Sequence, residues 1–147
     1  MRKRTCAWLL LLALGLAGWA GCRGGAQTNA PPSKPAGIDA LVAEINSFTD
    51  ELVKKVESAS DTSAGVDGAQ ALLDARREEL KAKVRAVREG REFRENKEAN
   101  GRLLECEVSN GDRVSALSTR YLDQSIKDPS LRSKLTRLRG DYNSIFD

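Results

Sequence analysis

Few residues in this chain could do chemistry, and the three cysteines, Cys6, Cys22 and Cys106, are the most reactive of them. The chain contains no histidine, which excludes histidine-based acid–base catalysis, Ser/His and Cys/His nucleophile pairs and histidine-containing zinc sites. The cysteines are too far apart for a CxxC motif, and no glycine-rich phosphate loop is present. We therefore expect no metal, no cofactor and no enzymatic activity.

Cys22 follows a segment with three parts. Arg2, Lys3 and Arg4 form a basic head, residues 7–17 are apolar apart from Gly15, and mostly small residues lead up to the cysteine. This order is typical of a secretory signal peptide. Because the apolar part is shorter than the roughly 20 residues of a transmembrane helix, a removable signal is favoured over a permanent span.

The sequence Ala20-Gly21-Cys22, after a leucine-rich stretch, resembles the lipobox of bacterial lipoproteins. The resemblance implies that the thiol of Cys22 carries diacylglycerol, that signal peptidase II cleaves before this residue, and that the new amino group is acylated. Small residues at the two preceding positions allow the peptidase to approach the backbone. Trp19 departs from the family pattern, which usually has leucine or another aliphatic residue there.

Lipidation of Cys22 would anchor the protein to a membrane, since each buried CH₂ contributes about 0.8 kcal/mol. In the alternative interpretation the protein is secreted, cleaved after Ala20 or Ala26, and Cys22 is unmodified. The resemblance also bears on location, because an aspartate after the lipidated cysteine often retains lipoproteins at the inner membrane. Arg23 occupies that position here. We therefore expect the outer membrane, facing the periplasm, with the inner membrane or cell surface as alternatives.

Removing the signal peptide changes the composition of the chain. The three basic residues of its head account for the whole formal net charge of +3, so the remaining chain is neutral and gives no indication of nucleic-acid binding. Both tryptophans and Cys6 also leave with the signal. With Cys22 lipidated, Cys106 is the only free thiol, and no intrachain disulfide can form.

The sequence divides into three predicted segments: a signal peptide over 1–21, the lipidated cysteine with a flexible linker over 22–36, and a helical domain over 37–147. The linker contains three of the four prolines, two glycines and no large apolar side chain, so it cannot bury enough surface to fold. As a flexible coil it would reach about 20 Å.

The domain shows the three- and four-residue apolar spacing of amphipathic helices. The spacing predicts a first helix from Ile38 to about Ser58, a loop over 58–68, and a second helix from about Gly68. Residues 90–111 are predicted to be mostly helical, with a bend at Asn100-Gly101 or Asn110-Gly111.

A further helix is predicted from Val114 to about Lys127, and Asp128-Pro129 should start the last helix, with Asp as N-cap and Pro at the first helical position. No segment alternates with a period of two, so we expect no strands. The predicted fold is all-α: a three- to four-helix bundle or a long helical hairpin with coiled-coil-like packing.

Other candidate side chains have plainer interpretations. Cys106 lies between two glutamates, which would raise the pKa of its thiol, and we interpret it as a small apolar residue of a helix; an intermolecular disulfide is the alternative. Carboxylate pairs such as Glu78 and Glu79 could act as acid and base, but they lie among arginines.

A basic stretch lies between Arg76 and Arg102, which together with the residues between them include ten Lys and Arg against six Asp and Glu. Its side chains could contact anionic lipid head groups or an acidic partner. A salt-bridged solvent face is the favoured interpretation. The residues that could line one side are Arg77, Lys81, Arg88 and Arg91.

These observations favour a non-enzymatic structural or protein-interaction module of the cell envelope. Its partners would be the membrane, through the lipid anchor, and an envelope protein of unknown identity, with homo-oligomerisation left open. The alternative is a protein that binds lipid or another apolar ligand inside a thinly packed bundle.

Overall fold

The computed structural model describes residues 36–147, apart from the side chains of Ala36 and Glu92. The predicted signal peptide, Cys22 and most of the linker lie outside the described residues. The four long helices are α1 (Ala36–Glu57), α2 (Thr62–Glu89), α4 (Lys97–Arg120) and α6 (Pro129–Asn143). The short ones are α3 (Arg91–Glu95), α5 (Leu122–Lys127) and the 3-10 turn η1 (Ser144–Phe146). Residues 36–147 contain no strand, so the all-α prediction is confirmed.

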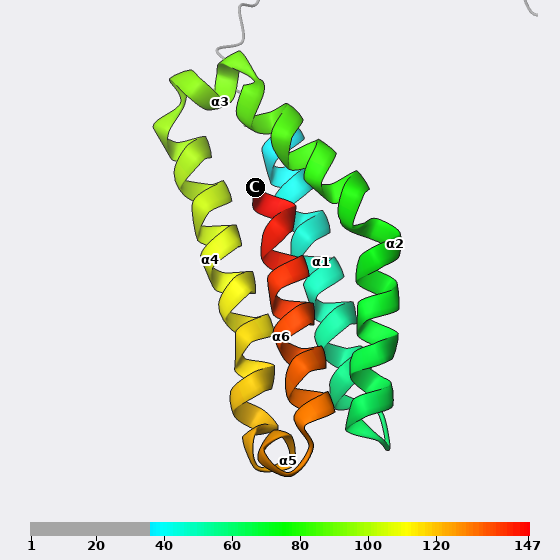
Figure 1. The fold of residues 1–147 in the computed structure, drawn as a ribbon. Coiled ribbons are helices and arrows are strands. Elements are labelled where there is room, and N and C mark those ends of the chain that lie inside the picture. The colour runs from blue at the N-terminus through cyan, green and yellow to red at the C-terminus, as the bar shows by residue number, and fades with distance from the viewer. Residues whose placement is uncertain (1–35) are drawn as a thin grey trace, which may run out of the picture. The chain divides into compact units, whose positions relative to one another are not determined.

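The four long helices form a bundle in which α1 and α4 run in one direction and α2 and α6 in the opposite one (Figure 1). Helices α1 and α2 form one hairpin, and α4 and α6 form a second that turns through α5. Helix α1 also packs on α4, and α2 on α6, so each long helix has two neighbours around a shared core. Of the predicted arrangements, the structure therefore adopts the four-helix bundle.

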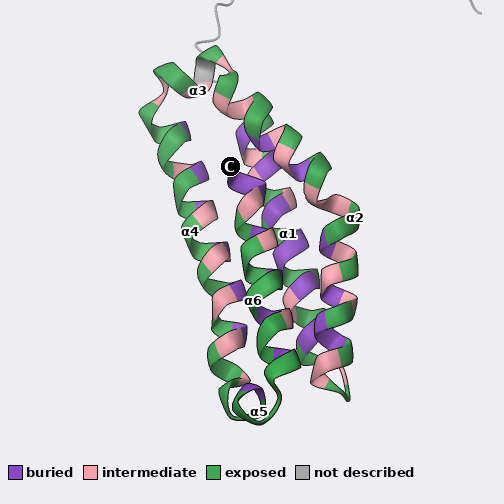
Figure 2. Cartoon of the chain, in the orientation of Figure 1, coloured by how far each residue is buried: buried purple, intermediate pink, exposed green. Residues whose placement is uncertain are grey.

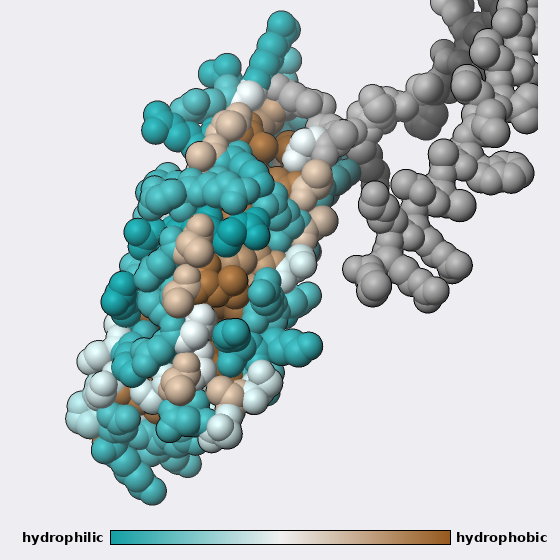
Figure 3. Space-filling view, turned by 90° about the vertical axis from the view of Figure 1, so that its right-hand side faces the viewer, coloured by the Kyte–Doolittle hydropathy of each residue, from teal (hydrophilic) through white to brown (hydrophobic). Residues whose placement is uncertain are grey.

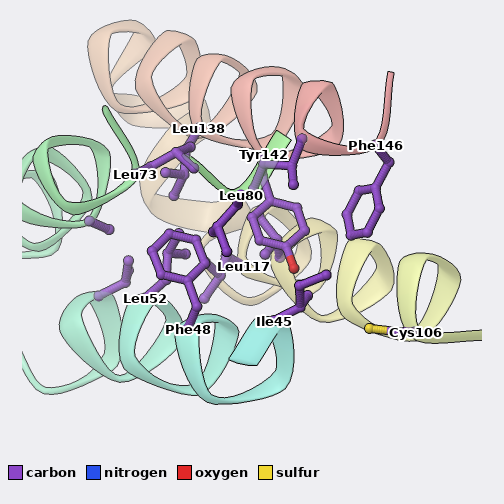
Figure 4. Packing of buried hydrophobic residues seen from close by; sticks show 14 of the residues in the cluster. Ile45, Phe48, Leu52, Leu73, Leu80, Cys106, Leu117, Leu138, Tyr142 and Phe146 are labelled. Atoms are coloured by element: carbon purple, nitrogen blue, oxygen red, sulfur yellow. The ribbon is translucent and has the colours of Figure 1, made fainter. Parts of the chain in front are cut away.

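The core is built from the apolar stripes of the four long helices, whose buried residues face inward (Figure 2). Ile45, Leu52, Leu73, Leu80 and Leu138 have almost no exposed surface. Burying a side chain of this size contributes about 1.5–3 kcal/mol. Figure 4 shows these residues surrounding the rings of Phe48 and Tyr142, which stack with centroids 6.5 Å apart.

The predicted loop over 58–68 is wrong beyond Asp61, because α2 begins at Thr62. The Asp61 side chain accepts a hydrogen bond from the backbone amide of Ala64 and caps the helix. Gly65 is buried at the α1–α2 crossing, where its missing side chain allows the backbones to approach. Two residues that suggested a loop therefore have other roles: Asp61 caps α2, and Gly65 allows α1 and α2 to pack closely.

The bend predicted at Asn100-Gly101 or Asn110-Gly111 is also wrong, because α4 runs unbroken through both pairs. The chain breaks earlier, at Gly90 and at Asn96, whose side chain accepts hydrogen bonds from the amides of Glu98 and Ala99. The predicted cap at Asp128 is confirmed: its carboxylate accepts from the amides of Ser130 and Leu131, and Pro129 follows at the first helical position.

Candidate functional surfaces

The predicted lipidation site, Cys22, lies outside the described residues. Its modification therefore stays a prediction. None of the helices in residues 36–147 combines the length and apolar character that a membrane crossing requires.

Cys106 lies on the core side of α4, in a small polar cluster between α1 and α4. Asn110 donates hydrogen bonds from Nδ2 to Oδ1 of Asn46, over 2.7 Å, and to the carbonyl of Cys106, over 2.9 Å. The same amide nitrogen lies 3.4 Å from the Cys106 sulfur. Burial raises the pKa of the Cys106 thiol, the hydrogen bond from Asn110 lowers it, and the charge of Glu107 raises it further. A buried thiol with a raised pKa is a weak nucleophile.

The second buried polar contact joins α1 to α6 across the core. The hydroxyl of Thr49 donates to the carbonyl of Ile45 over 2.8 Å, and the Thr49 and Tyr142 hydroxyls lie 2.5 Å apart. Because the Thr49 hydrogen is used within α1, Tyr142 is the donor of this pair. The contact satisfies two buried hydroxyls and therefore stabilises the packing.

The carboxylates considered for catalysis are held in ion pairs. Glu78 pairs with Arg77, and Glu79 pairs with Arg76 and Lys83. The hydrogen bond from Lys83 and then the charge of Arg76 lower the pKa of Glu79. A general acid at neutral pH needs the opposite shift. Within residues 36–147, no group of three or more Cys, Asp and Glu side chains is arranged to bind a metal ion.

Ion pairs account for most of the side chains predicted to line the basic stretch. Arg77 lies 3.4 Å from Asp141 on α6, Arg88 lies 2.8 Å from Glu107 on α4, and Arg91 pairs with Glu95. These contacts favour the salt-bridged solvent face. Figure 3 shows a mostly hydrophilic face of the molecule with hydrophobic residues visible in narrow seams.

Two pairs of large apolar side chains remain exposed, and sequence reasoning missed both. Leu104 and Val108 on α4 are 56% and 55% exposed, and Leu122 and Ile126 on α5 are 52% and 59% exposed. The members of each pair are four residues apart, so they lie on one side of their helix. Positions 104 and 108 are out of phase with the buried positions 103, 106, 110, 114 and 117, but which positions of α4 are buried became known only from the structure.

We call the exposed side of α4 around Leu104 and Val108 the outer α4 face. A shallow depression of about 540 Å³ lies in this face and is lined by Gly101, Leu104, Glu105, Val108, Ser109 and Asp112. A second groove, of about 330 Å³, shares Val108 and Asp112 and extends to Phe146 and Asp147. The two depressions therefore meet over Val108.

The outer α4 face also carries unpaired acidic charge. Glu105, Asp112 and Asp147 form no ion pair with any described residue, whereas the carboxylates between the helices, such as Glu44 and Asp141, are paired. Gly101 lies in the same face, and an added Cβ there would have nothing within 4 Å. An interior helical glycine costs about 1 kcal/mol relative to alanine, and no packing within the bundle requires one here.

Comparisons with known protein families, with curated proteins and with solved structures found no match to this chain. The assignment of function therefore depends on the residues themselves.

Proposed function

We propose that this protein is a bacterial lipoprotein, anchored through acyl groups on Cys22, whose helical domain is a non-enzymatic structural or interaction module of the cell envelope. The observation that carries the proposal is Ala20-Gly21-Cys22 after a basic head and an apolar stretch. The anchor would hold the domain at the outer membrane, facing the periplasm, through the linker over 22–36.

The helical domain supports an interaction role in two ways. The groups considered for catalysis are either buried, like Cys106, or engaged in ion pairs, like Glu79. The bundle nevertheless leaves Leu104 and Val108 exposed on one helix. Exposed apolar residues that are grouped together often mark a binding surface.

The alternative of an apolar ligand held inside the bundle has less support. Large side chains fill the space between the four long helices, among them Ile45, Leu80 and Tyr142. A ligand would have to displace this close packing. The variant Cys22→Ala lacks the predicted lipid anchor. Lipid that copurifies with this variant and is detected by mass spectrometry would favour this alternative.

The anchor is tested by replacing Cys22 with alanine and growing cells with radiolabelled palmitate. We expect the native protein to be labelled and to fractionate with membranes, and Cys22→Ala to lose both properties. Cys106→Ala is the matched control, because it removes a buried thiol and should leave labelling intact. A Cys22→Ala protein that is still labelled and membrane-bound would refute the proposal.

A further inference from the structure

We infer that the outer α4 face is a docking surface for a basic amphipathic helix of another envelope protein. This inference rests on the proposed function and gives it a location and a class of partner. Three observations on α4 support it: the exposed apolar pair, the unpaired carboxylates around that pair, and the open glycine in line with them.

The apolar pair provides the centre of the surface. Leu104 and Val108 are both more than half exposed, and Gly101 precedes them by one turn along the same side of α4. A partner helix with apolar residues three and four positions apart would lay them along this line. Exclusion of water from these two side chains would supply the main attraction.

The carboxylates define the charge of the partner. Glu105 and Asp112 line the depression beside Leu104 and Val108, and Asp147 lines the adjoining groove. None of the three has an ion-pair partner within the described residues. A helix with Lys or Arg flanking its apolar stripe would complement these charges and would be attracted to the surface.

The same charges argue against two other occupants. If a second copy of the chain used this face symmetrically, Glu105 and Asp112 would face identical carboxylates, and like charges at an interface are unfavourable. An anionic lipid surface would be repelled for the same reason. A basic partner helix is the occupant that satisfies both the apolar and the charged residues.

Gly101 indicates how closely the partner approaches. The space beside its Cα is open, so a second helix could bring its backbone near α4 at this point. Gly140 on α6 is equally open but has no exposed apolar neighbours of the same kind. The two glycines therefore form a matched pair for mutation.

The binding test uses the mature lipidated protein, residues 22–147, in nanodiscs of zwitterionic lipid, with empty nanodiscs as the blank. The probe is a synthetic Leu/Lys amphipathic helix of about 18 residues, and its matched control has Glu in place of Lys. We expect the Leu/Lys peptide to bind and the Leu/Glu peptide not to bind. Absence of binding by the Leu/Lys peptide, or equal binding of both peptides, overturns the inference.

Matched double variants locate the binding surface. Leu104→Lys with Val108→Lys should weaken binding of the Leu/Lys peptide by about tenfold or more, since it removes the apolar centre. Leu122→Lys with Ile126→Lys makes the same change of charge on α5 and should alter the affinity by less than about twofold. Equal losses in both variants would show only non-specific attraction and would overturn the inference.

Two further variants separate the charge from the shape of the surface. Glu105→Gln with Asp112→Asn should lower the affinity and flatten its dependence on salt, because screening acts on exposed charges. Gly101→Leu should weaken binding, although it adds apolar surface, while Gly140→Leu should not. Stronger peptide binding by Gly101→Leu would refute the inference that the backbone of the partner helix approaches α4 closely.

Photo-crosslinking in cells tests the physiological partner. A benzophenone amino acid at position 108 should crosslink to a segment that mass spectrometry identifies as a basic amphipathic helix, whereas the same group at position 126 should not. A crosslink to α4 of a second copy would overturn the inference. If Cys22→Ala loses its label but partners crosslink only from other faces, the proposed function stands and the docking surface on α4 is refuted.

Discussion

Gly65 provides a direct test of the α1–α2 crossing. Alanine has the higher helix propensity, so Gly65→Ala would gain about 1 kcal/mol at an open helical position. Here, however, the added Cβ would lie 2.7 Å from Cβ of Ala59, 3.0 Å from the carbonyl oxygen of Val56 and 3.2 Å from its Cα. Two of these three atoms are backbone, so the helices would have to separate. Overpacking of this kind costs about 1–3 kcal/mol.

The net expectation for Gly65→Ala is a loss of about 1 kcal/mol in the free energy of unfolding. Gly101→Ala and Gly140→Ala are the controls, because their added Cβ atoms meet nothing within 4 Å, and each should gain up to about 1 kcal/mol. Urea denaturation followed by circular dichroism at 222 nm would measure the three values. A Gly65→Ala protein as stable as the two controls would refute the close crossing.

Three other predictions concern the buried polar groups. Thr49→Val should lower the free energy of unfolding, measured by urea denaturation, by about 1–3 kcal/mol, because it leaves the Tyr142 hydroxyl buried without its acceptor. If the loss is no larger than in the exposed control Thr136→Val, the stabilising role of the buried contact is contradicted. Burial raises the pKa of Tyr142 to about 12, despite the opposing hydrogen bond with Thr49. An unfolded tyrosine titrates near 10, so the stability that this shift contributes is fully present below about pH 10 and is lost as the pH rises through about 12. The loss in the free energy of unfolding is at most about 2.7 kcal/mol. Urea denaturation at pH values across this range should show a smaller loss for Tyr142→Phe than for the native protein, and an equal pH dependence of the two proteins would count against the shift. Finally, in a variant lacking Cys6 and Cys22, maleimide should label Cys106 slowly in buffer and rapidly in urea, while fast labelling in buffer would mean that the thiol is accessible.

The sequence was most informative where the spacing of hydrophobic residues or a helix cap marked an element clearly. The large apolar residues of the first helix, from Ile38 to Val56, are buried as their spacing predicts, apart from Val42 and Val53, which are partly buried. Asp128 and Pro129 start the last helix as expected, since the chemistry of a helix cap is local. These two elements depend on neighbours in sequence, so short windows of sequence were enough to find them.

The errors came from residues whose role depends on distant neighbours. Gly65 resembles a loop residue until α1 is placed against it. Asn110 resembles a turn residue, but its amide is buried and bonded to Asn46 on another helix. Leu104 and Val108 could be recognised as exposed only after the phase of α4 against the bundle was known. Composition alone does not contain this information.

The pairing of the helices also bears on how the chain folds. Each hairpin joins helices that are close in sequence: four residues separate α1 from α2, and α4 reaches α6 through the short α5. Local contacts of this kind favour fast folding, so each hairpin can begin to form before the distant parts of the chain meet. The contact of Thr49 and Phe48 with Tyr142 then joins the two halves. In stopped-flow refolding, substitutions at Tyr142 should therefore mainly accelerate unfolding, whereas a change within one hairpin should alter the rate of folding as well.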